Sequence, residues 1–132
     1  MNPQSPIGKT KTQGWEIGVS RTLPISTTKA WDRIVSALGV DVKDFSKGAA
    51  FETRDRTRVE IRSFESGSLI RMTWQPPDWD FASTLQVRVT PAKTGATISV
   101  HHEKLQNGDQ REQMRARWTA LLEELKASVS ND

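Results

Sequence analysis

Residues 107–129 read NGDQREQMRARWTALLEELKASV and decide the fold of this chain. The turn residues at the start of this stretch end the preceding segment, and either Asn107 or Asp109 is suited to cap a helix. We therefore predict a helix over 110–128, roughly 28 Å long at 1.5 Å per residue. Its apolar residues recur on one face: Met114, Trp118, Leu121, Leu122, Leu125 and Val129. A helix with one apolar face needs a surface on which to bury it.

Strand-like segments upstream supply that surface, because they carry apolar and polar residues in alternation and turn residues separate them. Two prolines make 76–80 a loop, and 91–95 is expected to be a turn. A strand of eight residues spans about 27 Å, so the last helix is long enough to cover the sheet. The six predicted strands cover residues 15–23, 49–53, 57–64, 69–75, 83–90 and 96–103.

Two helices are expected between the first and second strands. The first covers 26–38, with Ser26 as its N-cap and Gly39 as its stop. A short second helix is expected within 40–47, with Phe45 facing the core. Strands joined by tight turns are antiparallel. The sequence therefore predicts an α+β fold: strand, two helices, five strands and a helix, with a curved six-stranded antiparallel sheet wrapped around the C-terminal helix.

Composition limits the function classes. The chain has 132 residues, 35% hydrophobic residues and a net charge of +3, which suits one globular domain over 14–129 behind a disordered tail over 1–13. No apolar run approaches the ~20 residues of a membrane span, and the start lacks a signal core. The absence of cysteine excludes disulfides and thiol catalysis, and fits the cytoplasm. Basic residues are interspersed with acids, so no nucleic-acid partner is expected.

Four stretches, taken in order, resemble the Bet v 1-like (START-like, SRPBCC) superfamily, and within it bacterial single-domain proteins similar to the C-terminal domain of the Hsp90 ATPase activator. The resemblance covers most of residues 15–127 and implies the helix-grip fold. The link over 39–48 is shorter than in the family and lacks its Trp, for which Phe45 is a substitute. The stretches are VSRTLPISTTKAWDRI, SFESGSLIRMTWQPPDW, STLQVRVTPAKTGATISVHHEKL and RARWTALLEELK.

The inward faces of the strands and helices are the candidate ligand site, lining a cavity for a hydrophobic or aromatic small molecule. The competing interpretation is that these side chains fill the interior at normal packing density. The face that Trp74 occupies stays open, because both sides of its strand carry apolar residues. The candidates are Trp31, Val59, Ile61, Trp74, Leu85, Val87, Ile98, Val100, His102, Met114, Trp118, Leu121 and Leu122.

The polar residues in and near this set suggest little chemistry. His101 and Glu103 share one face of their strand and His102 lies on the other, which leaves no third ligand nearby in sequence. We therefore expect no metal and no cofactor. His102 either anchors a ligand or acts as a base, or it is satisfied by local hydrogen bonds. Trp79 is either a lid over a pocket or a side chain packed on the edge of the core.

Three functions remain open. The first is non-catalytic binding of a hydrophobic or aromatic small molecule between the sheet and the C-terminal helix, by a monomer or weak dimer. The second is a cyclase- or hydrolase-like enzyme of the same superfamily, with His102 or Arg21 as the polar group. The third is a stress- or chaperone-related protein-interaction domain, which predicts a large exposed apolar patch.

Overall fold

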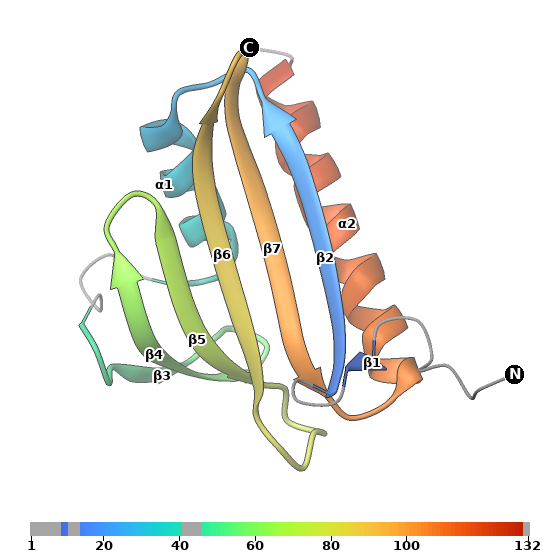
Figure 1. Ribbon diagram of the computed structural model, residues 1–132. Helices are drawn as coiled ribbons and strands as arrows, with labels where there is room; N and C mark the ends of the chain where they lie inside the picture. Colours follow the sequence, from blue (N-terminus) through green and yellow to red (C-terminus); the bar gives the residue numbers. More distant parts are fainter. Residues whose placement is uncertain (1–8, 11–13, 41–45, 131–132) are drawn as a thin grey trace, which may run out of the picture.

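The computed structural model describes residues 9–10, 14–40 and 46–130 and contains a seven-stranded antiparallel sheet with two helices (Figure 1). The strand order is β1-β2-β7-β6-β5-β4-β3, so the last strand lies inside the sheet, between β2 and β6. This confirms the predicted α+β antiparallel architecture. The elements are β1 (Lys9–Thr10), β2 (Gly14–Leu23), α1 (Thr27–Ala37), β3 (Ala50–Glu52), β4 (Arg58–Glu65), β5 (Leu69–Gln75), β6 (Ser83–Ala92), β7 (Gly95–Leu105) and α2 (Gly108–Ser130).

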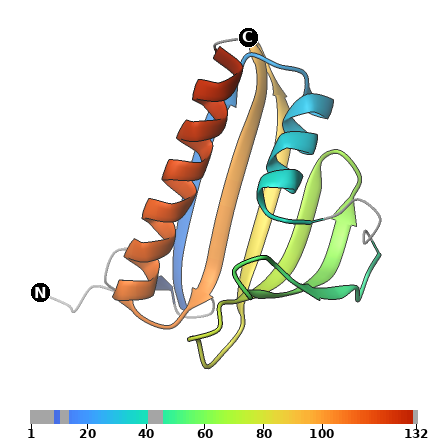
Figure 2. The same ribbon diagram turned by 180° about the vertical axis from the view of Figure 1, so that it is seen from behind.

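Both helices cover the same face of the sheet (Figure 2). Helix α2 packs on β2 and β7, and α1 packs on β7 and β6. The loop between β3 and β4 lies at the opposite edge of the sheet from β2, yet its Asp55 contacts Arg117 of α2. The sheet therefore curls around the long helix, as the helix-grip fold requires. No described helix is long and apolar enough to cross a bilayer.

The core lies between α2 and the inward face of the sheet. Met114, Trp118, Leu122 and Val129 of the α2 stripe are buried, while Leu121 and Leu125 are partly buried against them. Burying a side chain of this size stabilises the fold by about 1.5–3 kcal/mol. The sheet contributes the alternate residues of its central strands, including Ile61, Met72, Leu85, Val87, Ile98 and Val100.

Local signals set both ends of α1. The Ser26 hydroxyl accepts a hydrogen bond from the Lys29 backbone N–H at 3.2 Å, which confirms the predicted cap. Gly39 has a φ of +81°, a conformation that suits glycine and ends the helix. The buried face of α1 holds Ala30, Trp31, Ile34 and Val35. The helix therefore ends at Leu38 and Gly39, close to Thr53 in the loop between β3 and β4.

Some boundaries differ from the sequence prediction. Residues 9–10, predicted as part of a disordered tail, form β1 and pair with the start of β2; the rest of 1–13 lies outside the described residues. The predicted second helix falls largely on 41–45, also outside them, and 46–48 form a turn. Asn107, rather than Asp109, caps α2, because its side-chain oxygen accepts from the Gln110 N–H at 2.8 Å.

The turn between β6 and β7 is shorter than predicted. Pro91 was expected to begin the turn, but β6 continues to Ala92 and Pro91 pairs with Ala96. The strand tolerates a proline there because β5 pairs with β6 only as far as Arg88. Beyond that point one side of β6 has no neighbouring strand, so the missing N–H costs no ladder hydrogen bond.

Candidate ligand-binding site

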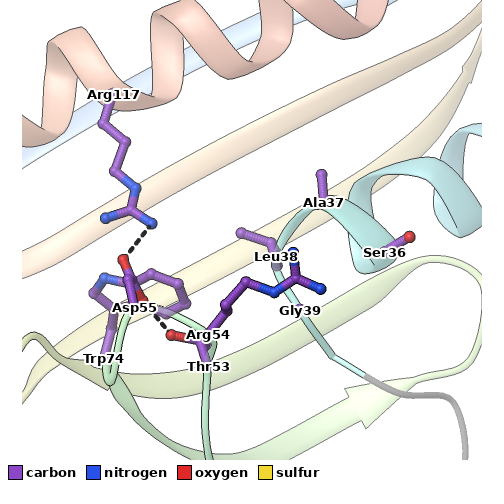
Figure 3. Close-up of a pocket in the computed structure, with 9 residues that line it drawn as sticks. All are labelled: Ser36, Ala37, Leu38, Gly39, Thr53, Arg54, Asp55, Trp74 and Arg117. Atoms are coloured by element: carbon purple, nitrogen blue, oxygen red, sulfur yellow. Dashed lines mark hydrogen bonds and ion pairs between the residues drawn. The ribbon is translucent and has the colours of Figure 1, made fainter.

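A pocket of about 510 Å³ opens where the C-terminal end of α1, the loop between β3 and β4, and α2 approach one another (Figure 3). Its volume falls within the ~300–1,000 Å³ typical of small-molecule sites. Trp74 of β5 forms part of its apolar lining. The lining residues are Ser36, Ala37, Leu38, Gly39, Thr53, Arg54, Asp55, Trp74 and Arg117.

Arg117 crosses one side of this pocket. Its Nη2 lies 3.3 Å from Asp55 Oδ2, and its Cζ lies 5.3 Å from the ring centroids of both Trp74 and Trp118. The hydroxyl of Thr53 donates to the other oxygen of Asp55. This hydrogen bond and the nearby Arg117 charge hold the pKa of Asp55 below its usual value. The pocket is therefore bordered by an ion pair that links the far edge of the sheet to α2.

Trp74 offers an unused hydrogen-bond donor beside that ion pair. The side chain is 1% exposed, and its ring packs edge-on against Trp118 with centroids 5.5 Å apart. Its Nε1–H is buried and has no acceptor among the described residues. A buried donor without a partner costs about 1–3 kcal/mol. The sequence left the face of Trp74 open, and the structure places this residue on the inward face.

A chain of hydrogen bonds runs behind Trp74. Trp118 Nε1–H donates to His102 Nδ1 at 3.0 Å, and His102 Nε2 lies 2.7 Å from Ser83 Oγ. Ser83 Oγ in turn donates to the Trp74 carbonyl at 2.6 Å. Because indole can only donate, Nδ1 of His102 must be the acceptor and Nε2 must carry the proton. His102 is therefore the Nε2–H tautomer and donates to Ser83.

This tautomer prevents His102 from activating Ser83. A general base needs an unprotonated nitrogen toward the hydroxyl, and here that nitrogen carries the proton. Burial lowers the pKa of His102 from 6.5 to about 3, and the Arg117 charge adds to the shift. Trp79 covers the other side of the ring, with centroids 6.1 Å apart. Both side chains thus follow the packed alternatives: His102 is satisfied by hydrogen bonds, and Trp79 lies on the core.

Arg21, the other polar group of the enzyme hypothesis, is directed away from the pocket. Its guanidinium forms an ion pair with Glu123 on the solvent side of α2 and donates to the Ser20 carbonyl. Neither group named for catalysis is therefore available to a bound molecule in this arrangement. The enzymatic alternative loses the residues that the sequence offered for it.

The predicted cavity-lining residues lie together, but chiefly as core. Trp74 is the one that also lines the pocket at the end of α1, and Val59 lines another along β3 and β4. Leu121 is partly buried against the core. Whether the set also encloses a hollow stays a prediction. Its buried members are Trp31, Val59, Ile61, Trp74, Leu85, Val87, Ile98, Val100, His102, Met114, Trp118 and Leu122.

Sequence reasoning missed most of the pocket, including Leu38, Thr53, Asp55 and Arg117. Two signals could have pointed to it: the charged run over 53–56, and Arg117 directly before the predicted core Trp118. Neither signal shows that these segments meet, because the ion pair joins residues 62 positions apart.

The outer face of the sheet brings together three groups able to bind a metal. Pairing of β2 with β7 places Glu16 beside His101 and Glu103, with one ligand atom of each within 4.8 Å of the others. The sequence offered His101 and Glu103 on one face, and the third group comes from a distant strand. Arg71 Nη2 donates to Glu103 Oε1 at 3.0 Å, so one carboxylate already has a cationic partner. The expected absence of a metal site stays untested.

Comparison with solved structures supports the fold. MLL2253 from Mesorhizobium loti has a TM-score of 0.70 and 21% identity, covering 88% of this chain and 97% of that chain. PFC0360w, an Hsp90 activator from Plasmodium falciparum, has a TM-score of 0.72 and 15% identity, covering 89% and 97%. The Aha1 dimer from Colwellia psychrerythraea has a TM-score of 0.66 and 11% identity, covering 86% and 95%.

These identities are low, so the three structures establish similarity of fold alone. No curated protein sequence matches the chain. A family model described as "Activator of Hsp90 ATPase homolog 1-like protein" matches residues 25–130, from the loop that follows β2 through α2. It confirms the resemblance carried by the sequence stretches. Because the match spans most of the sequence, the chain belongs to the family of activator of Hsp90 ATPase homolog 1-like proteins.

Proposed function

We propose that this protein binds a hydrophobic or aromatic small molecule, without catalysis, in the pocket between α1, the β3–β4 loop and α2. The observation that carries this proposal is a pocket of about 510 Å³ with an indole in its wall and a polar border. Ligand sites typically combine apolar walls with a few polar groups that orient the ligand. Leu38 and Trp74 supply apolar surface here, and Arg54, Asp55 and Arg117 supply the polar groups.

The hydrogen-bonded core behind the pocket supports binding rather than reaction. His102 and Ser83 satisfy each other and the adjoining backbone. The Ser83 hydrogen bond to the Trp74 carbonyl and the packing of Trp118 against the Trp74 ring hold Trp74 in place, so this part of the wall is formed before a ligand arrives. A rigid wall reduces the entropy lost on binding.

Filling the pocket tests the proposal. N-phenyl-1-naphthylamine is a neutral aromatic probe whose fluorescence rises in apolar surroundings. We expect the wild-type protein to bind it saturably at 1:1. Ala37→Trp places a large side chain at a lining position of α1, and should weaken binding at least tenfold. Ala127→Trp is the matched control, because it makes the same change at an exposed position of the other helix.

Two outcomes would overturn the proposal. One is a wild-type protein that shows no saturable binding of this probe at micromolar concentrations. The other is equal affinity in Ala37→Trp and Ala127→Trp. Unfolding midpoints of both variants show whether each is folded under the assay conditions.

The protein-interaction alternative receives less support from the described surface. It predicts an exposed apolar patch of more than a few hundred Å². Phe81, which is 66% exposed, is the exposed large hydrophobic side chain in the part of the chain that the structure describes. A single exposed side chain is common on monomeric proteins.

A further inference from the structure

The pocket contains a charge and a donor that one ligand group could use together. Two arginines and one aspartate line it, so the charged lining residues carry a net +1. Arg54 forms no ion pair with the described residues, whereas Arg117 is paired with Asp55. Trp74 Nε1–H, in the same wall, is buried without an acceptor. Figure 3 shows Arg117, Asp55 and Trp74 on one side of the pocket, with the ion pair between Arg117 and Asp55 drawn as a dashed line.

In this structure the carboxylate that Arg117 binds belongs to the protein itself, at Asp55. The pair is about half exposed, with side chains 52% and 39% accessible, so breaking it costs little free energy. Asp55 belongs to the loop between β3 and β4 and is not part of the hydrophobic core. The Trp74 donor, in contrast, belongs to the core and cannot move to find a partner. A ligand group that accepts hydrogen bonds would therefore compete with the weakly held Asp55 for Arg117. It would also find the Trp74 Nε1–H fixed in position and without an acceptor.

We propose that the pocket selects small molecules that carry a carboxylate on an aromatic or aliphatic body. The carboxylate takes the place of Asp55 on Arg117, and one of its oxygens accepts a hydrogen bond from Trp74 Nε1–H. In the empty pocket, Arg117 is paired with Asp55 instead. This inference rests on the proposed binding function and specifies its ligand class.

The chemistry favours a carboxylate over other groups. Guanidinium and carboxylate match in geometry, and charge-assisted hydrogen bonds are roughly twice as strong as neutral ones. The group that Arg117 already binds is itself a carboxylate. A cationic ligand would meet a positive lining, and the faces of Trp74 and Trp118 are already covered by Arg117. A neutral ligand would use the Trp74 donor but gain nothing from the arginine charge.

A matched pair of probes tests the inference by isothermal titration calorimetry at pH 7. 2-Naphthaleneacetate and 2-naphthaleneacetamide have nearly the same shape and differ in charge. We expect the acid to bind at least tenfold more tightly. Asp55→Asn removes the competing carboxylate charge and should raise the ratio of acid affinity to amide affinity severalfold. Arg117→Gln should bring the two probes to equal affinity.

Arg115→Gln is the control variant for charge. Arg115 lies on the same helix, is 62% exposed and pairs with Glu112 outside the pocket. It should preserve the tenfold preference. NMR tests the role assigned to Trp74. Its indole N–H proton resonance is identified by its absence from the spectrum of Trp74→Phe. This resonance should shift downfield when the acid saturates the protein.

The failures are distinguishable. If both probes bind wild-type protein equally, the carboxylate inference is wrong and the binding function stands. If the acid binds more tightly but the Trp74 N–H signal does not move, the assigned role of Trp74 is wrong. If neither probe nor N-phenyl-1-naphthylamine binds, the proposed function itself fails.

Discussion

Trp118 of α2 donates its indole N–H to Nδ1 of His102 on β7, with the two nitrogens 3.0 Å apart. Both side chains are almost fully buried. Helix packing by apolar contact alone tolerates small sliding, whereas a directional hydrogen bond fixes the helix along the strand. The same bond sets the tautomer of His102, and through Ser83 it reaches the backbone of Trp74 in the pocket wall. Docking of the long helix and the shape of the pocket are therefore coupled.

Replacing Trp118 by Ala should lower the free energy of unfolding by about 3–5 kcal/mol, because the change removes a large side chain from a filled site. Urea unfolding followed by circular dichroism measures it. Trp118→Phe keeps most of the ring but leaves His102 Nδ1 without a donor, and should cost about 1–3 kcal/mol. A loss below 1 kcal/mol in Trp118→Ala would mean that Trp118 borders an open hollow instead.

Acid should destabilise the protein through His102. The folded protein keeps this ring neutral down to about pH 3, whereas the unfolded chain binds a proton near pH 6.5. Between these values the unfolded state holds more protons, so stability falls as pH falls, by at most about 1.4 kcal/mol per pH unit. From pH 7 to pH 5 the expected loss is about 2 kcal/mol.

The variant His102→Gln isolates this effect, because glutamine is polar and does not titrate. Its stability at pH 7 will be lower, but its decline between pH 7 and pH 5 should be shallower than in wild type by about 2 kcal/mol. Urea unfolding at each pH gives the comparison. His101→Gln, on the outer face of the sheet, is the matched control and should retain the steep decline. Parallel pH profiles in wild type and His102→Gln would contradict the assigned burial.

The fold was predictable because its elements carry periodic signals. The apolar stripe from Met114 to Val129 indicates a helix that buries one face. The alternation of apolar and polar residues in 83–90 indicates a strand with one buried face. Such patterns state which side of an element is buried. They do not state how far a sheet curls, so they do not decide whether the inward set lines a hollow or fills the interior.

The pocket depends on contacts that periodicity does not encode. Asp55 meets Arg117 only because β3 and β4 curl back toward α2. Glu16 meets His101 only because the first long strand pairs with the last. Both faces of the strand that contains Trp74 carry apolar residues, so the sequence alone does not show which face is buried. All three features need the tertiary structure, and the first two join polar residues that are distant in the chain.

Asp55→Asn should change global stability by less than about 1 kcal/mol, since ion pairs this exposed contribute little. Its effect should be local. Loss of the carboxylate charge weakens the link between the β3–β4 loop and Arg117, so amide hydrogen exchange should accelerate over 53–57. Exchange in β6 and β7 should stay as in wild type. If exchange over 53–57 is unchanged, the ion pair does not hold the loop against α2.

Two glycines separate backbone strain from steric overlap. Gly67 has a φ of +84° and open space where a Cβ would lie, so Gly67→Ala should cost about 1–2 kcal/mol, from strain alone. Gly95 has a φ of +154°, and a Cβ there would lie 2.0 Å from the Leu23 carbonyl oxygen and 2.9 Å from the Ile25 nitrogen. Both obstacles are backbone atoms, which cannot rotate away as a side chain can.

Gly95→Ala should therefore cost more than about 3 kcal/mol, because the turn from β6 to β7 must separate from the chain that leads from β2 into α1. Thermal and urea unfolding of both variants measure the difference. A second expected effect is a weaker Ser26 cap, since that residue directly follows the obstructing Ile25. Equal costs at Gly67 and Gly95 would mean that the backbone at Leu23 and Ile25 shifts readily to make room for the added methyl group.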